Sequence, residues 1–235
     1  MDADDRTSGA PELDEVLRSA ARLQQVVHDA VLVGGADAAL HAGHRDSFDH
    51  DHVIADLARR YEDVLEAVEA TDGWATSVRA SRPPMTIMGS LGGIEAGLRQ
   101  MRRTRPLETV AVDLGDGLVV VAPTADDMLR VKAYLVVQRN QVRDYLDVVA
   151  LADHLGPTRT HEALSVIDDY YDDRSGEHGS VLTSLVMHLA DPSPRDDVVT
   201  RELHRYKRLD ERWHDWRAVV SACEALAMDL AEGRS

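Results

Sequence analysis

The spacing of apolar residues changes character along the chain. In the first half, two segments with helical spacing, 11–29 and 54–69, are interleaved with short runs in which apolar and polar residues alternate, as is typical of strands. The predicted strands are 31–33, 48–53, 74–79, 86–88, 109–114 and 118–122. Gly115-Asp116-Gly117 separates the last two and predicts a hairpin, whereas the glycines within 89–97 predict turns, bulges or close backbone approach. This order favours an α+β fold, with a mixed sheet flanked by helices.

Beyond the hairpin the strand pattern stops and helical spacing returns. Thr124 followed by Asp127 resembles a capping box, with Asp in place of Glu, and predicts the start of a helix that ends at Gly156-Pro157. Asn140 either lies within this helix or divides it in two. Further helices are predicted over 161–172, 180–190 and 200–232.

The change of pattern near Pro123 predicts two domains, 1–122 around the sheet and 123–235 all helical. No apolar run approaches the length of a membrane span, and the acidic N-terminus, 1–5, lacks the features of a signal peptide. We therefore expect a cytoplasmic protein without membrane contact. The lone cysteine, Cys223, lies on the apolar face of the last predicted helix and is expected to be a small core residue.

The candidate chemistry lies between the first predicted strand and the strand over 48–53. Gly34 and Gly35 follow the first strand, and without side chains their backbone at the start of a helix can approach a phosphate closely. Asp49 and Asp51 alternate with histidines, which places both carboxylates on one face of the strand, about 7 Å apart at Cα. Mg²⁺ takes one or two carboxylates together with substrate phosphates. The spacing therefore predicts a site for a Mg²⁺-bound nucleotide.

The net charge of −16 argues against a protein that binds nucleic acid over its whole surface. Contact with a polyanion must then be local, through two runs of basic residues. The alternative is that these runs are solvated surfaces whose charges balance nearby acidic residues. These runs are Arg99, Arg102, Arg103 and Arg105, and Arg130, Lys132, Arg139 and Arg143. Lys132 is notable because the chain has only two lysines, Lys132 and Lys207, and otherwise uses arginine. On one continuous helix Lys132, Arg139, Arg143 and Asp147 would share an edge within about 80°.

These residues together resemble the nucleotidyltransferase superfamily, whose signature is a hydrophobic residue, Gly-Gly or Gly-Ser, a spacer and Asp-x-Asp. Here Val33-Gly34-Gly35 precedes Asp49-His50-Asp51 at a spacing within that signature. The runs 132–140 and 143–147 look like the lysine and Arg-Asp motifs of the AbiEii/MenT branch, whose members are toxins of toxin–antitoxin systems. The resemblance covers 31–156 and implies a nucleotidyltransferase-like sheet domain whose site is completed by the helical domain.

Carried onto this chain, the resemblance implies that Asp49 and Asp51 hold Mg²⁺ and that Lys132 contacts nucleotide phosphate. An acid of the Arg-Asp run would complete the catalytic site. The shared helix edge favours Asp147, whereas the motif alone leaves Asp144 open as well. The expected nucleotide-binding residues are Gly34, Gly35, Ser47, Arg139 and Arg143.

Known members of this branch transfer nucleotides, often pyrimidines, from an NTP to the 3′ acceptor end of tRNA, and so block translation. The resemblance therefore implies an NTP, a tRNA acceptor end and a cognate antitoxin as partners, with Mg²⁺ as cofactor. In some relatives the antitoxin phosphorylates a hydroxyl at the position of Ser47. Ala36 departs from the pattern, because many relatives carry a small hydroxyl residue there, and one phosphate contact is in doubt.

Three other interpretations fit parts of the sequence. A nucleotidyltransferase that modifies a cationic aminoglycoside would share the metal and nucleotide residues, and the acidic composition suits such a substrate. A metal phosphohydrolase is suggested by His44, His50-Asp51 and His52, although in that class the His-Asp pair lies on a helix. A non-catalytic interaction subunit would keep the fold alone. If these histidines bind no metal, we expect them at the surface or in the second layer of residues around the nucleotide site. His50 and His52 would then face away from the carboxylates.

Overall fold

The computed structural model describes residues 11–172, 179–206 and 208–233. At its centre is a five-stranded mixed sheet with the strand order β1-β2-β5-β4-β3. β2 and β5 run parallel, whereas the other neighbouring pairs run antiparallel. The strands are β1 (Val31–Val33), β2 (Asp49–Ile54), β3 (Trp74–Thr76), β4 (Thr86–Leu91) and β5 (Ile94–Gln100).

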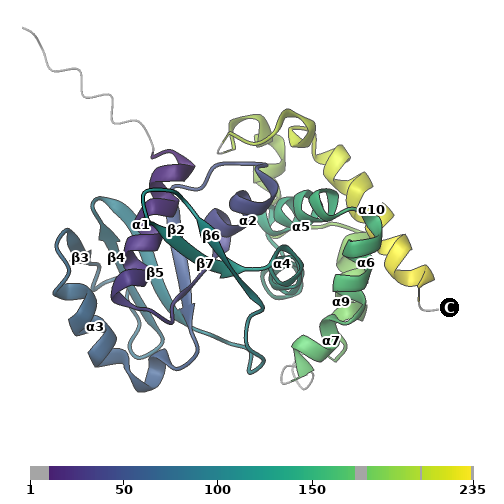
Figure 1. Cartoon of the computed structure of the whole chain (residues 1–235). Helices are drawn as coiled ribbons and strands as arrows, with labels where there is room; N and C mark the ends of the chain where they lie inside the picture. The colour runs from purple at the N-terminus through teal and green to yellow at the C-terminus, as the bar shows by residue number, and fades with distance from the viewer. Residues whose placement is uncertain (1–10, 173–178, 207, 234–235) are drawn as a thin grey trace, which may run out of the picture.

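Two helices, α1 (Leu13–Val26) and α3 (Tyr61–Glu69), cover one face of the sheet. Leu23 of α1 and Val68 of α3 belong to one buried cluster with Ile54 of β2, and Figure 1 shows α1 lying across the strands. Alternate side chains of a strand point to opposite faces. The carboxylate positions of β2 therefore face away from α1.

The hairpin predicted over 109–122 is present, formed by β6 (Thr109–Asp113) and β7 (Val119–Pro123). It is a separate two-stranded sheet rather than part of the central one. Gln24 of α1 fixes its position, since its side-chain amide accepts from Val121 N at 2.7 Å and donates to Val121 O at 2.8 Å.

The rest of the described chain is helical and packs around one large hydrophobic cluster, which also includes Val33 and Ala38 from the first half. Cys223 is fully buried in this cluster, as predicted. The α-helices are α2 (Gly34–Ala42), α4 (Ala125–Arg139), α5 (Val142–Leu155), α6 (Pro157–Ser165), α7 (Ile167–Tyr170), α9 (Val181–Ala190) and α10 (Trp216–Glu232). Short 3₁₀ turns are η1 (Leu57–Arg59), η3 (Asp197–Arg201), η4 (Leu203–Arg205) and η5 (Glu211–Trp213).

Asn140 divides the predicted helix after Thr124 into α4 and α5. Its φ of +51° is left-handed, a conformation that Asn tolerates better than most residues. Its side chain is held on both sides, since Nδ2 donates to Ser193 O at 2.8 Å and Oδ1 accepts from the Tyr145 hydroxyl at 2.6 Å. The single helix edge expected to align Lys132 with Asp147 therefore does not exist, and their side chains meet across two helices instead.

Several further predictions differ from the structure. The helix predicted over 54–69 begins at Tyr61, the strand predicted over 74–79 ends at Thr76, and the helix predicted over 161–172 is divided into α6 and α7. The strand β5 was not predicted, because Gly97 and the charged Glu95 and Arg99 obscure its apolar alternation. The helix predicted over 200–232 begins only at Trp216, because Asp215 caps it by accepting a hydrogen bond from Arg217 N at 3.0 Å.

The predicted α+β fold, with a mixed sheet flanked by helices and followed by a helical half, is confirmed. The strand pattern ends with β7 and the helices begin with α4, but a hydrophobic cluster crosses this point, and the division at 122/123 stays a prediction. Within the described residues no helix combines the length and the apolar character that crossing a membrane requires. The acidic segment 1–5 and Lys207 lie outside the described residues.

Candidate active site

Asp49 and Asp51 point from β2 into the same cavity. This cavity has a volume of about 630 Å³, and Gly34, Gly35 and Lys132 also line it. The strand register places Asp51 opposite Val33 on β1 and opposite Gly97 on β5. The residues of β2 alternate between half-buried carboxylates and fully buried neighbours, so the sequence pattern itself directs both acids to one side.

Two glycines leave the space that Asp51 occupies. A Cβ atom at Gly97 would lie 2.3 Å from Asp51 Oδ1, and one at Gly34 would lie 3.5 Å from Asp51 Cβ. Gly34 also has a φ of +88°, which favours glycine. The middle of β5 therefore requires a residue without a side chain in order to admit this carboxylate, whereas the turn into α2 favours glycine because of its backbone conformation.

Because Gly35 has no side chain, Ser47 and Arg45 can approach the start of α2 closely. A Cβ atom there would lie 2.8 Å from Ser47 Oγ and within 3.1 Å of both terminal nitrogens of Arg45. Ser47 is buried, and its hydroxyl lies 3.2 Å from Asp49 O and 3.1 Å from Asp49 Oδ1, to which it donates. The helix start, the hydroxyl and the first carboxylate thus form one continuous wall.

Lys132 of α4 reaches the cavity and binds Asp147 of α5, with Nζ 2.7 Å from Oδ2. Arg45 binds the same carboxylate at both oxygens, at 2.9 and 3.1 Å, and His44 Nε2 lies 2.8 Å from Oδ1. Asp147 is fully buried and is not among the residues that line the cavity, in the part of the chain that the structure describes. The residues brought to the cavity are therefore Lys132 and Arg45, with Asp147 behind them.

Opposing effects set the protonation of this group. Burial alone would raise the pKa of Asp147, but the charges of Arg45 and Lys132 and the hydrogen bond with His44 lower it well below its usual value. Burial lowers the pKa of His44, against the attraction of Asp147. Asp147 is therefore an anion and His44 a neutral imidazole near pH 7.

Asp144 lies elsewhere. Its Oδ1 accepts a hydrogen bond from Arg139 at 2.7 Å, its Oδ2 is buried without a hydrogen-bond partner in the described structure, and burial raises its pKa despite Arg139. Like Asp147, Asp144 is absent from the described cavity lining, whereas Arg139 and Arg143 belong to it. The assignment of the last site acid stays a prediction, but neither candidate faces the cavity.

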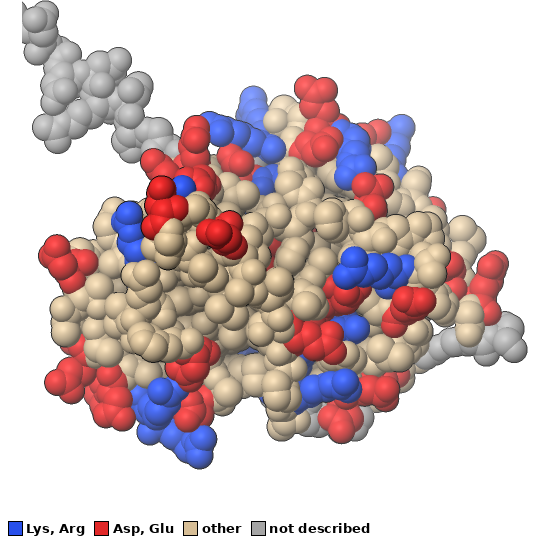
Figure 2. All heavy atoms as spheres, viewed as in Figure 1, with Lys and Arg blue, Asp and Glu red and all other residues tan. Residues whose placement is uncertain are grey.

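Several arginines of the two basic runs contact other residues of the protein, and two of them, Arg103 and Arg130, are buried. Arg103 forms a buried pair with Asp127 at 2.5 Å, Arg105 lies over the Tyr170 ring at 3.8 Å, and Arg130 pairs with Glu108 at 3.1 Å. Figure 2 shows acidic and basic side chains intermingled on the face viewed. The basic residues that line the cavity are Arg45, Arg99, Arg102, Arg103, Lys132, Arg139 and Arg143.

The expected surface position of His50 and His52 is wrong, although both do face away from the carboxylates. Both are buried, and His50 Nε2 lies 3.0 Å from Ser19 Oγ of α1. Burial lowers the pKa of His50 to about 4 and lowers the pKa of His52 well below its usual value. Because His50 and Asp51 lie on a strand, the helical His-Asp pair of a phosphohydrolase is absent from this position.

The carboxylate pair suits Mg²⁺. Asp49 and Asp51 offer hard oxygen ligands on a rigid strand, and the glycines beside them leave room for substrate phosphates. No cluster of three metal-ligating side chains occurs among the described residues, so the remaining ligands would be nucleotide oxygens and water. Arg99 Nε lies 3.1 Å from Asp51 Oδ1 at the open side of the cavity, and this contact competes with a cation.

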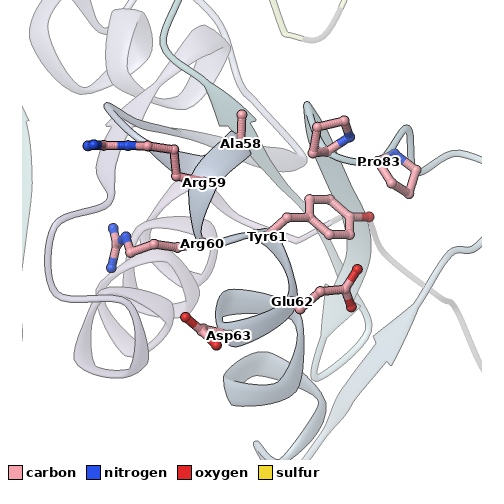
Figure 3. A pocket seen from close by; sticks show the side chains of 8 residues that line it. Ala58, Arg59, Arg60, Tyr61, Glu62, Asp63 and Pro83 are labelled. Carbon is pink, nitrogen blue, oxygen red and sulfur yellow. The ribbon is translucent and has the colours of Figure 1, made fainter.

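A second cavity, of about 330 Å³, lies between η1, the start of α3 and Pro83-Pro84, and its lining residues differ from those of the cavity that holds the carboxylate pair. Figure 3 shows Arg59 and Arg60 pointing to one side of it and Tyr61 to the other. Both arginines form ion pairs with Asp56. Because both arginines are paired in this way, neither brings an unpaired charge to the second cavity with which to bind a ligand.

Sequence reasoning missed Arg45 and the tyrosines of the cavity wall. Tyr134 and Tyr171 stack with their ring centroids 4.0 Å apart, and both line the cavity with Tyr206. Arg45 stands two positions before Ser47, so its period-two spacing with Ser47, Asp49 and Asp51 offered a signal. No such spacing links the tyrosines, which come from distant segments.

No family model matches the chain. The chain is 38% identical over 95 residues to the heme uptake protein MmpL11 of Mycobacterium tuberculosis, and 31% identical over 132 residues to the mycolic acid-containing lipids exporter MmpL11 of Mycolicibacterium smegmatis. The matches cover 40% and 56% of this chain but 10% and 13% of those proteins. The chain thus spans about a tenth of the length of these relatives, and their transport roles are stated for them alone.

The fold is similar to that of JHP933 from Helicobacter pylori. The alignment has a TM-score of 0.50 at 14% identity and covers 94% of this chain and 93% of JHP933. An antigenic nucleotidyltransferase-like protein from Paracoccidioides brasiliensis aligns at 18% identity over 74% of this chain and 93% of its own, with a TM-score of 0.45. The first likeness is one of fold alone, and the second is too weak to support a conclusion.

Proposed function

We propose that the chain is a Mg²⁺-dependent nucleotidyltransferase that moves a nucleotide from an NTP to the 3′ acceptor end of tRNA. One observation carries this proposal: Asp49 and Asp51 line the same cavity as the glycine start of α2 and Lys132. A carboxylate pair, exposed helix N–H groups and a lysine are the groups that in-line transfer at a phosphorus atom requires.

In the proposed reaction the acceptor hydroxyl oxygen bonds to the α-phosphorus, the bond between the α-phosphate and the β-phosphate breaks, and pyrophosphate leaves while the hydroxyl proton passes to water. Asp49 and Asp51 would hold Mg²⁺, which when bound neutralises the triphosphate and lowers the pKa of the acceptor hydroxyl. The backbone N–H groups at Gly34 and Gly35 orient phosphate oxygens. Lys132 places a point charge beside the leaving pyrophosphate.

The cavity residues specify the acceptor molecule less closely than they specify the NTP. In support of tRNA, Arg99, Arg102 and Arg143 line the cavity, so a single-stranded 3′ end would meet cations there. The net charge of −16 favours the second candidate, transfer to a cationic aminoglycoside. Incubation of the protein with Mg²⁺ and α-labelled NTPs, in parallel with tRNA and with an aminoglycoside, tests both. Label on tRNA alone supports the proposal, and label on the drug alone replaces it.

A toxin role follows if tRNA is the acceptor, because tRNA with a modified 3′ end cannot be aminoacylated. We propose that a cognate antitoxin restrains the enzyme and that Ser47, which donates to Asp49, is the residue it modifies. Induced expression should arrest growth, and Asp49→Asn should abolish the arrest. Titration calorimetry in which the wild type binds no NTP with Mg²⁺ would favour a non-catalytic subunit instead.

A further inference from the structure

Every hydrogen-bonding position of the Asp147 carboxylate is filled. Oδ1 lies 2.8 Å from His44 Nε2 and 2.9 Å from Arg45 Nε, and Oδ2 lies 2.7 Å from Lys132 Nζ and 3.1 Å from Arg45 Nη2. An ionised carboxylate has about four lone-pair sites, and these four donors use them all. Asp147 therefore has no oxygen lone pair left with which to bind a metal ion or accept a proton from substrate.

The two cations on Asp147 come from distant parts of the chain and line the same cavity. Arg45 lies in the loop between α2 and β2, and Lys132 lies on α4. Both are nearly fully buried, with side-chain exposures of 3% and 4%. Two cations held by one anion and a neutral His44 leave this group with a net positive charge, which is the sign that suits a phosphate ligand.

Arg45 keeps donors for a ligand. A guanidinium has five N–H groups, and the described contacts of Arg45 use three, two to Asp147 and one to Asp46 O at 3.1 Å. Its terminal nitrogens pack against Gly35, at the helix start where phosphate is expected. The two nitrogens that carry the remaining N–H groups therefore lie beside the start of α2.

We propose that Arg45 and Lys132 form a two-cation clamp for the phosphates of the NTP, and that Asp147 is the positioning residue that holds both in place. This inference rests on the proposed function and deepens it: Arg45 touches substrate, whereas Asp147 touches neither substrate nor metal. The clamp also joins the sheet half to α4 and α5, so the proposal requires both halves for nucleotide binding.

Binding of a non-hydrolysable NTP analogue and of its nucleoside, each with Mg²⁺, tests the clamp without catalysis. Asp147→Asn keeps the side-chain shape and removes the charge, and Arg45→Gln removes one cation while Lys132 and His44 remain on Asp147. The matched control is Asp153→Asn, because Asp153 is also an α5 aspartate bound by an arginine, Arg212 at 2.7 Å, but is half exposed. Mn²⁺ binding measured by electron paramagnetic resonance reports on Asp49 and Asp51 separately.

We expect Asp147→Asn and Arg45→Gln each to weaken NTP binding by about tenfold or more, with little change for the nucleoside and for Mn²⁺, and Asp153→Asn to match the wild type. Loss of Mn²⁺ binding in Asp147→Asn would overturn the positioning role in favour of metal ligation. If Asp147→Asn does not fold, Arg45→Gln decides: NTP affinity within about twofold of wild type overturns the clamp. If the wild type transfers nucleotide and both variants bind NTP as tightly as the wild type does, the clamp is rejected and the proposed function stands. If the wild type binds no NTP, the proposed function and the clamp are both rejected.

Discussion

Gly97 of β5 lies so close to Asp51 of β2 that a Cβ atom at position 97 would be 2.3 Å from Asp51 Oδ1. The parallel pairing of these strands, together with the Gly34 turn on the other side, gives the carboxylate its place. A site defined by backbone proximity in this way is sensitive to a single methyl group on the neighbouring strand.

Gly97→Ala should therefore reduce transfer by about tenfold or more, because Asp51 must rotate away from the position in which, under the proposed function, it would hold a metal ion with Asp49. Steady-state transfer rates at several Mg²⁺ concentrations measure the effect. Gly43→Ala is the control, because a Cβ atom there meets nothing within 4 Å although its φ is +60°. The control should cost about 1 kcal/mol of stability and no activity, and equal activity of both variants would contradict the close approach.

Asp144 and Asp147 of α5 should differ in their contribution to the stability of the fold. Asp147→Asn leaves two buried cations without a charged partner, so we expect a loss of about 3 kcal/mol or more in the free energy of unfolding. Asp144→Asn should cost less, because only one oxygen of Asp144 is paired and burial raises its pKa, which opposes its ionisation. Urea denaturation of both variants compares them, and a larger loss for Asp144→Asn would contradict the described network.

The buried histidines predict a loss of stability in mild acid. The pKa of His50 is lowered to about 4 in the folded protein, whereas an unfolded histidine titrates near 6.5. The unfolded chain therefore binds more protons below pH 6.5, and the stability present above that pH is lost as the pH falls to about 4, by about 3 kcal/mol for this residue.

Chemical denaturation between pH 8 and pH 4 measures this slope. His50→Gln cannot titrate but still offers Ser19 a hydrogen-bonding partner, so its stability should vary less with pH across the same window. An unchanged slope in His50→Gln would show that other groups cause the acid sensitivity.

The sequence predicted those parts of the site that depend on local spacing. Asp49 and Asp51 share a face because successive side chains of a strand point to opposite faces. Gly34-Gly35, directly after an apolar strand, indicated the start of a helix. The contacts of Asp147 depend instead on how α4 and α5 pack after the Asn140 break, and the expected single helix gave the wrong geometry. Arg45 had a signal in its period-two spacing with Ser47, whereas Tyr171 reaches the cavity through tertiary folding alone, which no short pattern encodes.

Transfer of label from an α-labelled NTP to tRNA, by wild type, Asp49→Asn and Lys132→Met in the presence of Mg²⁺, tests the central claim most directly. The account predicts labelled tRNA and an equal amount of pyrophosphate with the wild type, no transfer with Asp49→Asn, and transfer reduced by about a hundredfold with Lys132→Met. Full activity of both variants, with melting curves like that of the wild type, would contradict it.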